Sequence, residues 1–211
     1  MEIAPSILNA DFYCLKKQLD ILKKHGIKKL HMDVMDGHFV DNISFAFPVI
    51  ESLYGKGFDL DTHLMISDPG KYAERFAKYS KIVTVHYETC DDHAKILENI
   101  RKNDALAGIS LNPDTPAEKV VPLLGKFDLI LIMSVFPGYG GQKFIDDVLI
   151  KAQFMQQFKS KYGFLTEIDG GINMENFARI KEGGTVDIAV MGSALMNSML
   201  AKNLKILRRY E

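Results

Sequence analysis

The chain has 211 residues, and 47% of them are hydrophobic, which is ample for the core of one domain spanning residues 1–211. Its 26 basic and 27 acidic side chains give a formal net charge of −1, so no overall electric field attracts nucleic acid or an anionic membrane. Apolar runs such as LILIM (129–133) are far shorter than the roughly 18 to 20 residues that cross a bilayer. We therefore expect neither nucleic acid nor a membrane as a partner.

The first residues, MEIAPSILNADF, lack the basic and apolar regions of a secretory signal peptide. Cys14 and Cys90 are the only cysteines, too few for a disulfide framework. We therefore expect a cytoplasmic protein with reduced thiols.

Short β-branched runs alternate with longer amphipathic stretches, and eight such pairs follow one another along the chain. The predicted strands cover 2–8, 28–34, 58–66, 81–88, 106–112, 128–135, 164–171 and 186–193. The predicted helices cover 12–26, 47–57, 68–80, 91–103, 115–127, 146–163, 174–184 and 194–209. Asp11 and Asp68 are suitable N-caps, Pro69 suits a first helical position, and Gly26 suits a helix end.

Eight β–α units spaced by roughly 20 to 30 residues are typical of an α/β protein with the (β/α)₈ (TIM) barrel fold. An open doubly wound sheet usually has fewer strands and a G-x-G-x-x-G turn after the first one, but the first turn here, SILNADF, has no glycine. The barrel places its active site at the carboxyl ends of the strands. Polar residues at those ends are therefore candidates for function.

Ligand-type side chains stand at nearly every predicted strand end. They are Ser6, His31, Asp33, His63, His86, Glu88, Asn112, Ser134, Asp169 and Ser193. His31 and Asp33 are two residues apart, so they point to one face of a strand about 6.5 to 7 Å apart, a separation that one metal ion can bridge. His63 and Asp169 can reach the same point from other strands of a closed barrel. Two imidazoles and two carboxylates suit one divalent ion such as Zn²⁺, Fe²⁺, Co²⁺ or Mn²⁺.

Glycine-rich segments follow the last two strands, IDGGI (168–172) and VMGSAL (190–195), where barrels of this kind often bind phosphate through backbone N–H groups. A third segment, FPGYGGQKF (136–144), is long for a βα loop and is either a lid or a flexible connector. A phosphate site beside a metal and two carboxylates favours proton abstraction next to a carbonyl. Aspartates on opposite faces of the substrate would invert the carbon, which is epimerase chemistry.

These motifs, with IAPSILNADF, HMDVMDGHFV, HLMI, LNPDTP, MSVFPGYGGQKFI, EIDGGI and MGSAL in this order, resemble the ribulose-phosphate 3-epimerase family. The resemblance runs from residue 3 to about residue 196. It implies a metal-dependent barrel of the ribulose-phosphate-binding type that interconverts ribulose 5-phosphate and xylulose 5-phosphate in the pentose phosphate pathway. It also implies a homo-oligomer, since the family forms dimers and larger rings.

The resemblance assigns a role to each matching position. It implies His31, Asp33, His63 and Asp169 as metal ligands, with Asp33 and Asp169 also the acid–base pair. It implies that Ser6 and His63 contact the substrate, and that the phosphate lies among Gly138, Tyr139, Gly140, Gly141, Gly170, Gly171, Gly192 and Ser193. Met35, Met65 and Met133 match methionines around the reacting carbons, although methionines at strand ends also fill cores. We assign Asp36 and His38 to loop structure, and His86 to a place behind a ligand or to barrel filling.

Three departures from the family pattern lie in loops around the substrate. Phe136 replaces a polar or acidic residue, Asp41 replaces a proline, and SFAFPVI (44–50) lacks a glycine before its proline. They leave D-allulose 6-phosphate open as the alternative substrate.

Two other classes are weighed against an epimerase. Relatives of orotidine-phosphate decarboxylase carry D-x-K-x-x-D on a strand, and the stretch HMDVMD (31–36) has no lysine. A non-catalytic sugar-phosphate-binding barrel would not need the four ligand-type residues that are intact here.

Overall fold

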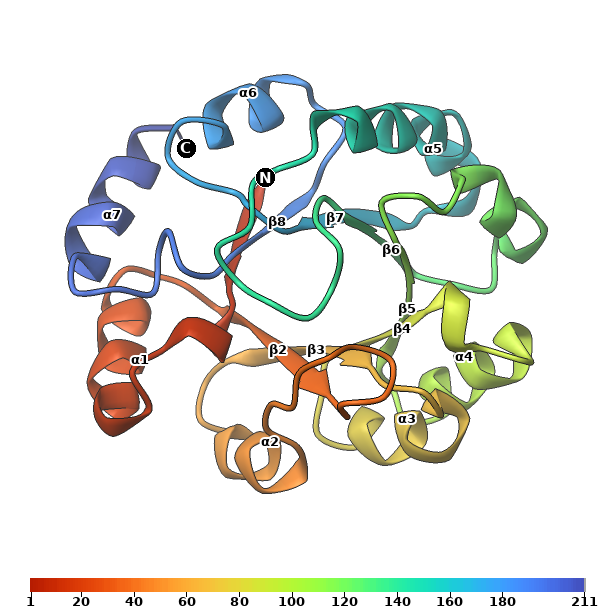
Figure 1. Ribbon diagram of the computed structural model, residues 1–211, viewed down its shortest axis with the longest axis horizontal. Coiled ribbons are helices and arrows are strands. Elements are labelled where there is room, and N and C mark those ends of the chain that lie inside the picture. The colour runs from red at the N-terminus through yellow and green to blue at the C-terminus, as the bar shows by residue number, and fades with distance from the viewer. Residues whose placement is uncertain (211) are drawn as a thin grey trace.

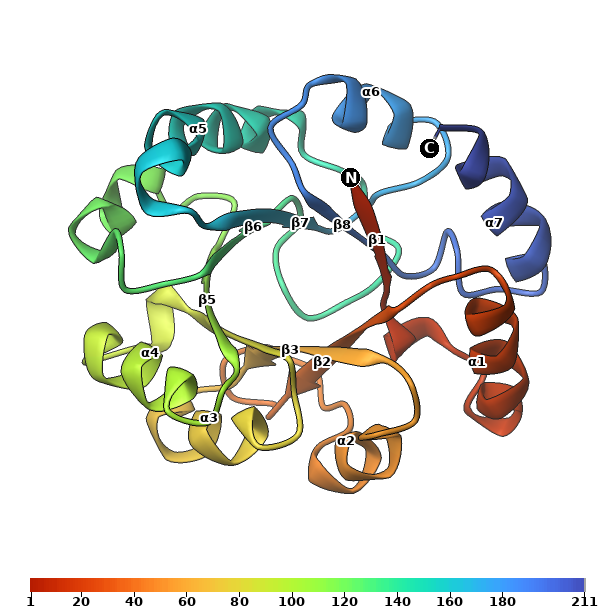
Figure 2. The same cartoon turned by 180° about the vertical axis from the view of Figure 1, so that it is seen from behind.

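The computed structural model describes residues 1–210, in which eight parallel strands form one sheet that curves into a ring (Figure 1). The strands are β1 Glu2–Pro5, β2 Lys29–Met35, β3 Asp59–Met65, β4 Ile82–His86, β5 Leu106–Leu111, β6 Leu129–Met133, β7 Leu165–Asp169 and β8 Ile188–Met191. Helices surround the ring on all sides, as the view from behind also shows (Figure 2). The (β/α)₈ barrel expected from the sequence is confirmed.

The ring closes unevenly. Each strand pairs in register with its neighbours in the order β1-β8-β7-β6-β5-β4-β3-β2. β1 and β2, at the two ends of this order, lie side by side, but within residues 1–210 one isolated parallel bridge, between Ser6 and His31, is the sole sheet pairing that joins them. The seam of the barrel therefore lies at two residues that the sequence singles out for function.

Within residues 1–210 there are seven α-helices, and each overlaps a helix predicted from the sequence. They are α1 Leu15–Lys24, α2 Phe47–Leu53, α3 Pro69–Ala77, α4 His93–Arg101, α5 Leu149–Tyr162, α6 Phe177–Glu182 and α7 Leu200–Leu207. The Asp68 carboxylate accepts from the Lys71 N–H and Pro69 is the first residue of α3, so this predicted helix start is confirmed. Within residues 1–210, every helix is too short or too polar to cross a membrane.

Two predicted helices differ from the structure. Residues 115–127 contain only a 3₁₀-helix, Ala117–Leu123, and Pro122 inside it lacks the N–H that an α-helix would use there. The last predicted helix begins at Leu200 instead of 194. The Asn197 side chain accepts from the Met199 N–H, and Asn203 donates to the Ala194 carbonyl, so side chains take the place of helical hydrogen bonds.

The barrel interior is divided into an apolar and a polar part. Alanine, leucine and valine side chains from β1, β6 and β8 form the apolar part, with Ala4, Leu129, Leu131 and Val190 all at 0–1% exposure. Side chains from β2, β3, β4 and β7 form the polar part, and His31, Asp61, His63, His86 and Glu167 are fully buried there. Buried titratable groups need partners, so this half of the interior is where chemistry is expected.

Candidate active site

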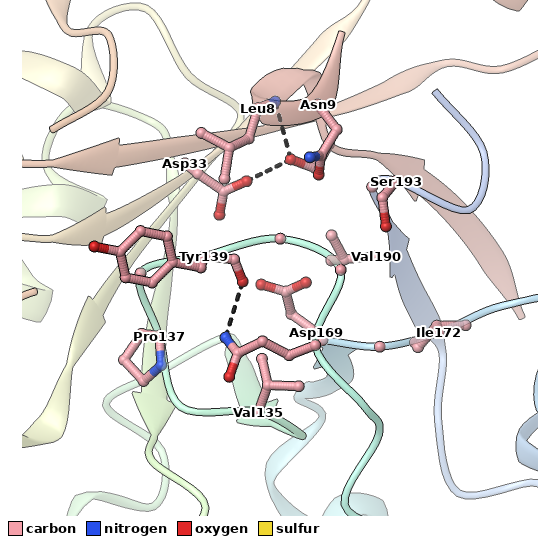
Figure 3. Close-up of a pocket in the computed structure, with 18 of the residues that line it drawn as sticks. Leu8, Asn9, Asp33, Val135, Pro137, Tyr139, Asp169, Ile172, Val190 and Ser193 are labelled. Atoms are coloured by element: carbon pink, nitrogen blue, oxygen red, sulfur yellow. Dashed lines mark hydrogen bonds between the residues drawn. The ribbon is translucent and has the colours of Figure 1, made fainter. Parts of the chain in front are cut away.

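A cavity opens at the carboxyl ends of the strands, on the face that the segment between β6 and α5 crosses (Figures 1 and 3). The predicted substrate-binding residues that line it are Ser6, Gly138, Tyr139, Gly140, Gly141, Gly170, Gly171, Gly192 and Ser193. Met35, Met65 and Met133 line it as well. His63 does not, because its ring is fully buried beneath the cavity.

The four predicted metal ligands converge at the base of this cavity. One ligand atom from each of His31, Asp33, His63 and Asp169 lies within 4.8 Å of all the others. Asp33 Oδ1 is 3.4 Å from His31 Nε2 and 3.6 Å from His63 Nδ1. Asp169 Oδ2 is 3.9 Å from the same two nitrogens. The strands thus bring together residues that are up to 138 positions apart, from 31 to 169.

Two nitrogens in this cluster are left without a hydrogen bond. His31 Nε2 and His63 Nδ1 are buried and have no hydrogen-bond partner within residues 1–210, although carboxylate oxygens lie close to both. Buried polar atoms are almost always hydrogen-bonded. A buried ring nitrogen that faces two carboxylates without a hydrogen bond is the arrangement expected of a metal ligand in the apoprotein. The donor set of two imidazoles and two carboxylates therefore fits a divalent ion.

Burial and neighbouring charges push the two aspartates in opposite directions. Burial raises the pKa of Asp169, and the nearby Asp33 charge raises it further, to about 7. Burial also acts on Asp33, but the charge of His31 and the close approach of the His31 and His63 rings outweigh it and hold the pKa of Asp33 well below its usual range. Two carboxyl groups with such different proton affinities are typical of an acid–base pair.

Each histidine of the cluster has further buried side chains behind it. His31 Nδ1 lies 3.4 Å from Asp61 Oδ2 and 3.6 Å from Glu167 Oε1. His63 Nε2 lies 2.8 Å from His86 Nε2, on the neighbouring strand β4. Asp61 and Glu167 are absent from the sequence prediction, yet each stands two residues before a predicted ligand. The alternation that pairs His31 with Asp33 would have pointed to them.

A close approach of two loops shapes the glycine-rich end of the cavity, where the sequence predicts phosphate binding. Gly171 has a φ of +62°, and a Cβ there would lie 2.5 Å from the Phe144 nitrogen and 2.7 Å from the Gln142 carbonyl oxygen, so only glycine fits. Within residues 1–210, the backbone N–H groups of Gly171, Ser193 and Ala194 make no hydrogen bond with a protein acceptor. Unpaired N–H groups at a cavity wall are suited to an anion such as phosphate.

Asn9 also lines the cavity and is missing from the sequence prediction. Its side-chain oxygen lies 2.5 Å from where a Cβ of Gly140 would be and 2.6 Å from that of Gly192. Asn9 therefore fills the space between two glycine-rich loops. It lies within the quoted motif SILNADF, but nothing in the local pattern distinguishes it from a helix-flanking asparagine.

The loop 136–144 is fastened across the mouth. Asn42 Nδ2 donates to the Gly138 carbonyl at 2.7 Å, and the Tyr139 hydroxyl donates to the Asp41 carbonyl. Within the loop, Gln142 donates to two carbonyls, at 2.8 and 2.9 Å. These bonds join the loop after β6 to the loop after β2 and hold the glycines over the cavity.

Asp36 belongs to the loop structure, as the sequence predicts. Its carboxylate accepts from the N–H groups of His38 and Phe39 and from both the N–H and the hydroxyl of Ser67, at 2.8 to 3.0 Å. The hydrogen bonds from these groups hold the pKa of Asp36 at about 2, although burial works against them. Asp36 therefore ties the loop after β2 to the end of β3.

Comparison with known proteins agrees with this geometry. A sequence model of the ribulose-phosphate 3 epimerase family matches residues 2–196. The chain belongs to the ribulose-phosphate 3-epimerase family. It is 39% identical over 200 residues to a ribulose-phosphate 3-epimerase of Bacillus subtilis, covering 92% of each chain. It is 43% identical over 197 residues to one of Mycobacterium bovis, covering 92% of this chain and 85% of the relative.

The family and the enzyme class expected from the motifs, an epimerase, are thus confirmed. More distant solved structures share only the fold with this epimerase-family chain. A 3-hexulose-6-phosphate synthase from Salmonella typhimurium superposes with a TM-score of 0.71 at 12% identity, covering 100% of this chain and 98% of the other. A tryptophan synthase α-subunit from Pyrococcus furiosus gives 0.67 at 13% identity, covering 99% and 95%.

Proposed function

We propose that this chain is a metal-dependent ribulose-phosphate 3-epimerase that interconverts D-ribulose 5-phosphate and D-xylulose 5-phosphate. The observation that carries the proposal is the meeting of Asp33 and Asp169 with two unpaired histidine nitrogens at the base of the cavity. The names of relatives about 40% identical over most of the chain support the choice of substrate.

In this proposal His31, Asp33, His63 and Asp169 hold one divalent ion, with Zn²⁺, Fe²⁺, Co²⁺ and Mn²⁺ all suited to the donor set. When bound, the ion supplies Lewis acidity that polarises the ketone of the substrate. The ligand side chains come from β2, β3 and β7 and are at most 17% exposed, so packing holds their positions.

The two aspartates move the proton. One takes it from C3, leaving an enediolate, and the other returns a proton to the opposite face of the same carbon. Asp33 and Asp169 suit this exchange because their carboxylates extend from opposite sides of the cavity (Figure 3). The Ser6 hydroxyl donates to Asp33 Oδ2, which keeps that oxygen fixed while Oδ1 faces the cluster.

The glycine-rich end of the cavity binds the phosphate. The free N–H groups of Gly171, Ser193 and Ala194 supply donors, and the loop 136–144 covers the sugar. Enclosing the substrate also keeps bulk water from protonating the enediolate, so the two aspartates decide which face of C3 receives the proton.

The remaining part of the proposal concerns the surroundings of the enzyme. A small sugar phosphate is its only partner besides copies of itself, with neither nucleic acid nor membrane involved, and it works as a homo-oligomer in the cytoplasm. A net charge of −1 supports the absence of a polyanionic partner. Light scattering on the purified chain measures the oligomeric state.

The deciding experiment compares kcat/KM for D-ribulose 5-phosphate and D-allulose 6-phosphate in one preparation. A clear preference for the pentulose phosphate is expected, and a preference for allulose 6-phosphate would replace the proposed substrate while keeping the mechanism. In D₂O, deuterium should enter C3 during turnover. Tight binding without deuterium incorporation would identify a non-catalytic sugar-phosphate-binding barrel.

A further inference from the structure

A line of three contacting side chains, His63, His86 and Glu88, extends away from the cavity, and the proton transfer described above does not use His86 or Glu88. His63 Nε2 is 2.8 Å from His86 Nε2, with the two rings 26° apart in plane. His86 Nδ1 is 3.2 Å from Glu88 Oε2. Both histidines are fully buried, so bulk water does not reach the contact between their rings, whereas the Glu88 side chain at the end of the line is 20% exposed.

Glu88 is anchored at the outer end of this line. Its Oε1 accepts from the Asn112 N–H at 2.9 Å and from the Thr115 hydroxyl, both in the loop after β5. The Phe39 ring covers His86 with its centroid 4.7 Å from that of the imidazole. The line therefore joins a site residue on β3 to backbone on the far side of β4.

The hydrogen bonds along the line all donate in one direction, from His63 toward Glu88. His63 Nδ1 faces the carboxylates of Asp33 and Asp169 without a partner, and a neutral imidazole that offers a lone pair there carries its proton on Nε2. That proton is donated to His86 Nε2, so the proton of His86 stands on Nδ1 and is donated to Glu88. Only an acceptor without a proton of its own can end the line, and an ionised carboxylate is one.

We propose that His86 and Glu88 are positioning residues, which hold the His63 ring and its tautomer so that Nδ1 presents a lone pair to the divalent ion. This inference rests on the metal centre of the proposed function. It assigns a role to a carboxylate that touches neither the cavity nor the other three ligands. A histidine placed between ligand and carboxylate extends the usual arrangement in which a metal-bound imidazole donates directly to a carboxylate.

The alternative is that His86 only fills the barrel. Ser110 is a buried neighbour of His86 that takes no part in the line. It pairs with His86 in the β4–β5 register, is fully buried, and has no hydrogen-bond partner within residues 1–210. Ser110→Ala is therefore a matched control from the same layer of the interior. Glu98→Gln, at an exposed ion pair on α4, is the matched control for the loss of a carboxylate.

Glu88→Gln is the sharpest variant. A glutamine has one acceptor oxygen where the carboxylate has two, so its amide must oppose either the Asn112 and Thr115 donors or the His86 N–H. If the amide NH₂ faces His86, the protons shift along the line and the His63 proton moves to Nδ1, the atom meant for the ion. His86→Phe keeps an aromatic ring but removes both nitrogens.

The experiment measures Co²⁺ affinity by competition with a chelating dye, together with the visible spectrum of the Co²⁺ protein and the thermal unfolding of the apoprotein. Glu88→Gln and His86→Phe are expected to weaken Co²⁺ binding about 10- to 100-fold and to change the spectrum, since loss of such partners has effects of this size. The double variant should bind about as weakly as the weaker single variant, because both act through His63. Ser110→Ala and Glu98→Gln should bind as the wild type does.

Three results would overturn the inference or its basis, and they are distinguishable. Unchanged Co²⁺ affinity and spectrum in Glu88→Gln, with or without a lower unfolding temperature, would reduce the line to packing. Effects that add fully in the double variant would contradict a single line. A wild type that binds no divalent ion would remove the proposed metal centre itself. If His86→Phe does not fold, Glu88→Gln decides alone.

Discussion

Asp33 and Asp169 approach the same two histidine nitrogens from opposite sides of the barrel, one from β2 and the other from β7. Their nearest oxygens lie 3.4 and 3.9 Å from His31 Nε2, and 3.6 and 3.9 Å from His63 Nδ1. No sheet hydrogen bond joins β2 to β7, so only closure of the ring makes this meeting possible. Catalysis in the proposed function depends on that closure as much as on the residues.

Replacing Asp169 by asparagine tests the acid–base pair. Asp169→Asn removes a group that gives or takes the C3 proton, so turnover should fall at least 100- to 10,000-fold, about the range for loss of general acid–base catalysis. Deuterium entry from D₂O into C3 measures the same step. The circular dichroism spectrum of Asp169→Asn should be unchanged. Asp59→Asn is a control because Asp59 is an exposed carboxylate at the first residue of β3, far from the cavity, and it should leave the rate unchanged. Normal epimerisation by Asp169→Asn would refute its role.

Removing the metal should affect both activity and stability. The two unpaired histidine nitrogens and two carboxylates are forced together in the apoprotein, and binding an ion there relieves their cost. A chelator should abolish turnover and a divalent ion restore it. Unfolding should also require about 2.7 kcal/mol more when the free ion is 100 times its Kd. Full turnover by protein shown to be metal-free by elemental analysis would contradict the metal centre.

Asp36 should stabilise the fold in a pH-dependent way. The pKa of Asp36 in the folded protein, about 2, lies below the ordinary value of 3.8. The contribution of the Asp36 carboxylate to the free energy of unfolding is therefore complete above pH 3.8 and is lost as the pH falls through about 2. Asp36→Asn should lower the free energy of unfolding at pH 7 by about 1 kcal/mol after solvent screening of this partly exposed group is allowed for.

Urea unfolding at pH 7 and pH 3 measures the Asp36 effect. The difference between wild type and Asp36→Asn should shrink at the lower pH. Asp41→Asn, in the same loop, is the control because only its backbone carbonyl takes part in a hydrogen bond within residues 1–210. A difference that stayed constant between the two pH values would mean that the carboxylate charge is not what stabilises the loop.

Gly171→Ala should disturb the glycine-rich end of the cavity, where the proposed function places the phosphate. The Cβ that this substitution adds would clash with the backbone of Gln142 and Phe144 at the end of the loop 136–144. This clash would displace the loop from the cavity, so KM for the sugar phosphate should rise. Gly163→Ala is a matched control, since its φ of +70° is similar but nothing lies within 4 Å of its Cβ. That variant should lose about 1 kcal/mol of stability and keep its KM. Equal KM values in the two variants would show that the close approach does not matter for binding.

Local patterns were enough to predict the strands and part of the site. β-Branched runs gave the eight strands, and the spacing of His31 and Asp33 placed both on one face. The partners of buried histidines were harder to foresee, because the contacts of Glu167 with His31 and of His86 with His63 depend on which strands become neighbours or face each other. The α-helix predicted over 115–127 was wrong because the prediction relied on the spacing of apolar residues and did not take account of Pro122, which interrupts an α-helix.

The seam between β1 and β2 gives the proposed ion a second consequence. The single bridge that closes the ring joins Ser6 to His31, and Ser6 also donates to Asp33. His31 and Asp33 lie on β2, next to this single bridge. An ion held by them and by His63 and Asp169 would link β2 to β3 and β7 and so stabilise the sheet where its pairing is sparsest. Amide hydrogens flanking this bridge should then exchange with solvent at a rate set by ion occupancy, whereas those of the fully paired β4 to β6 region should not.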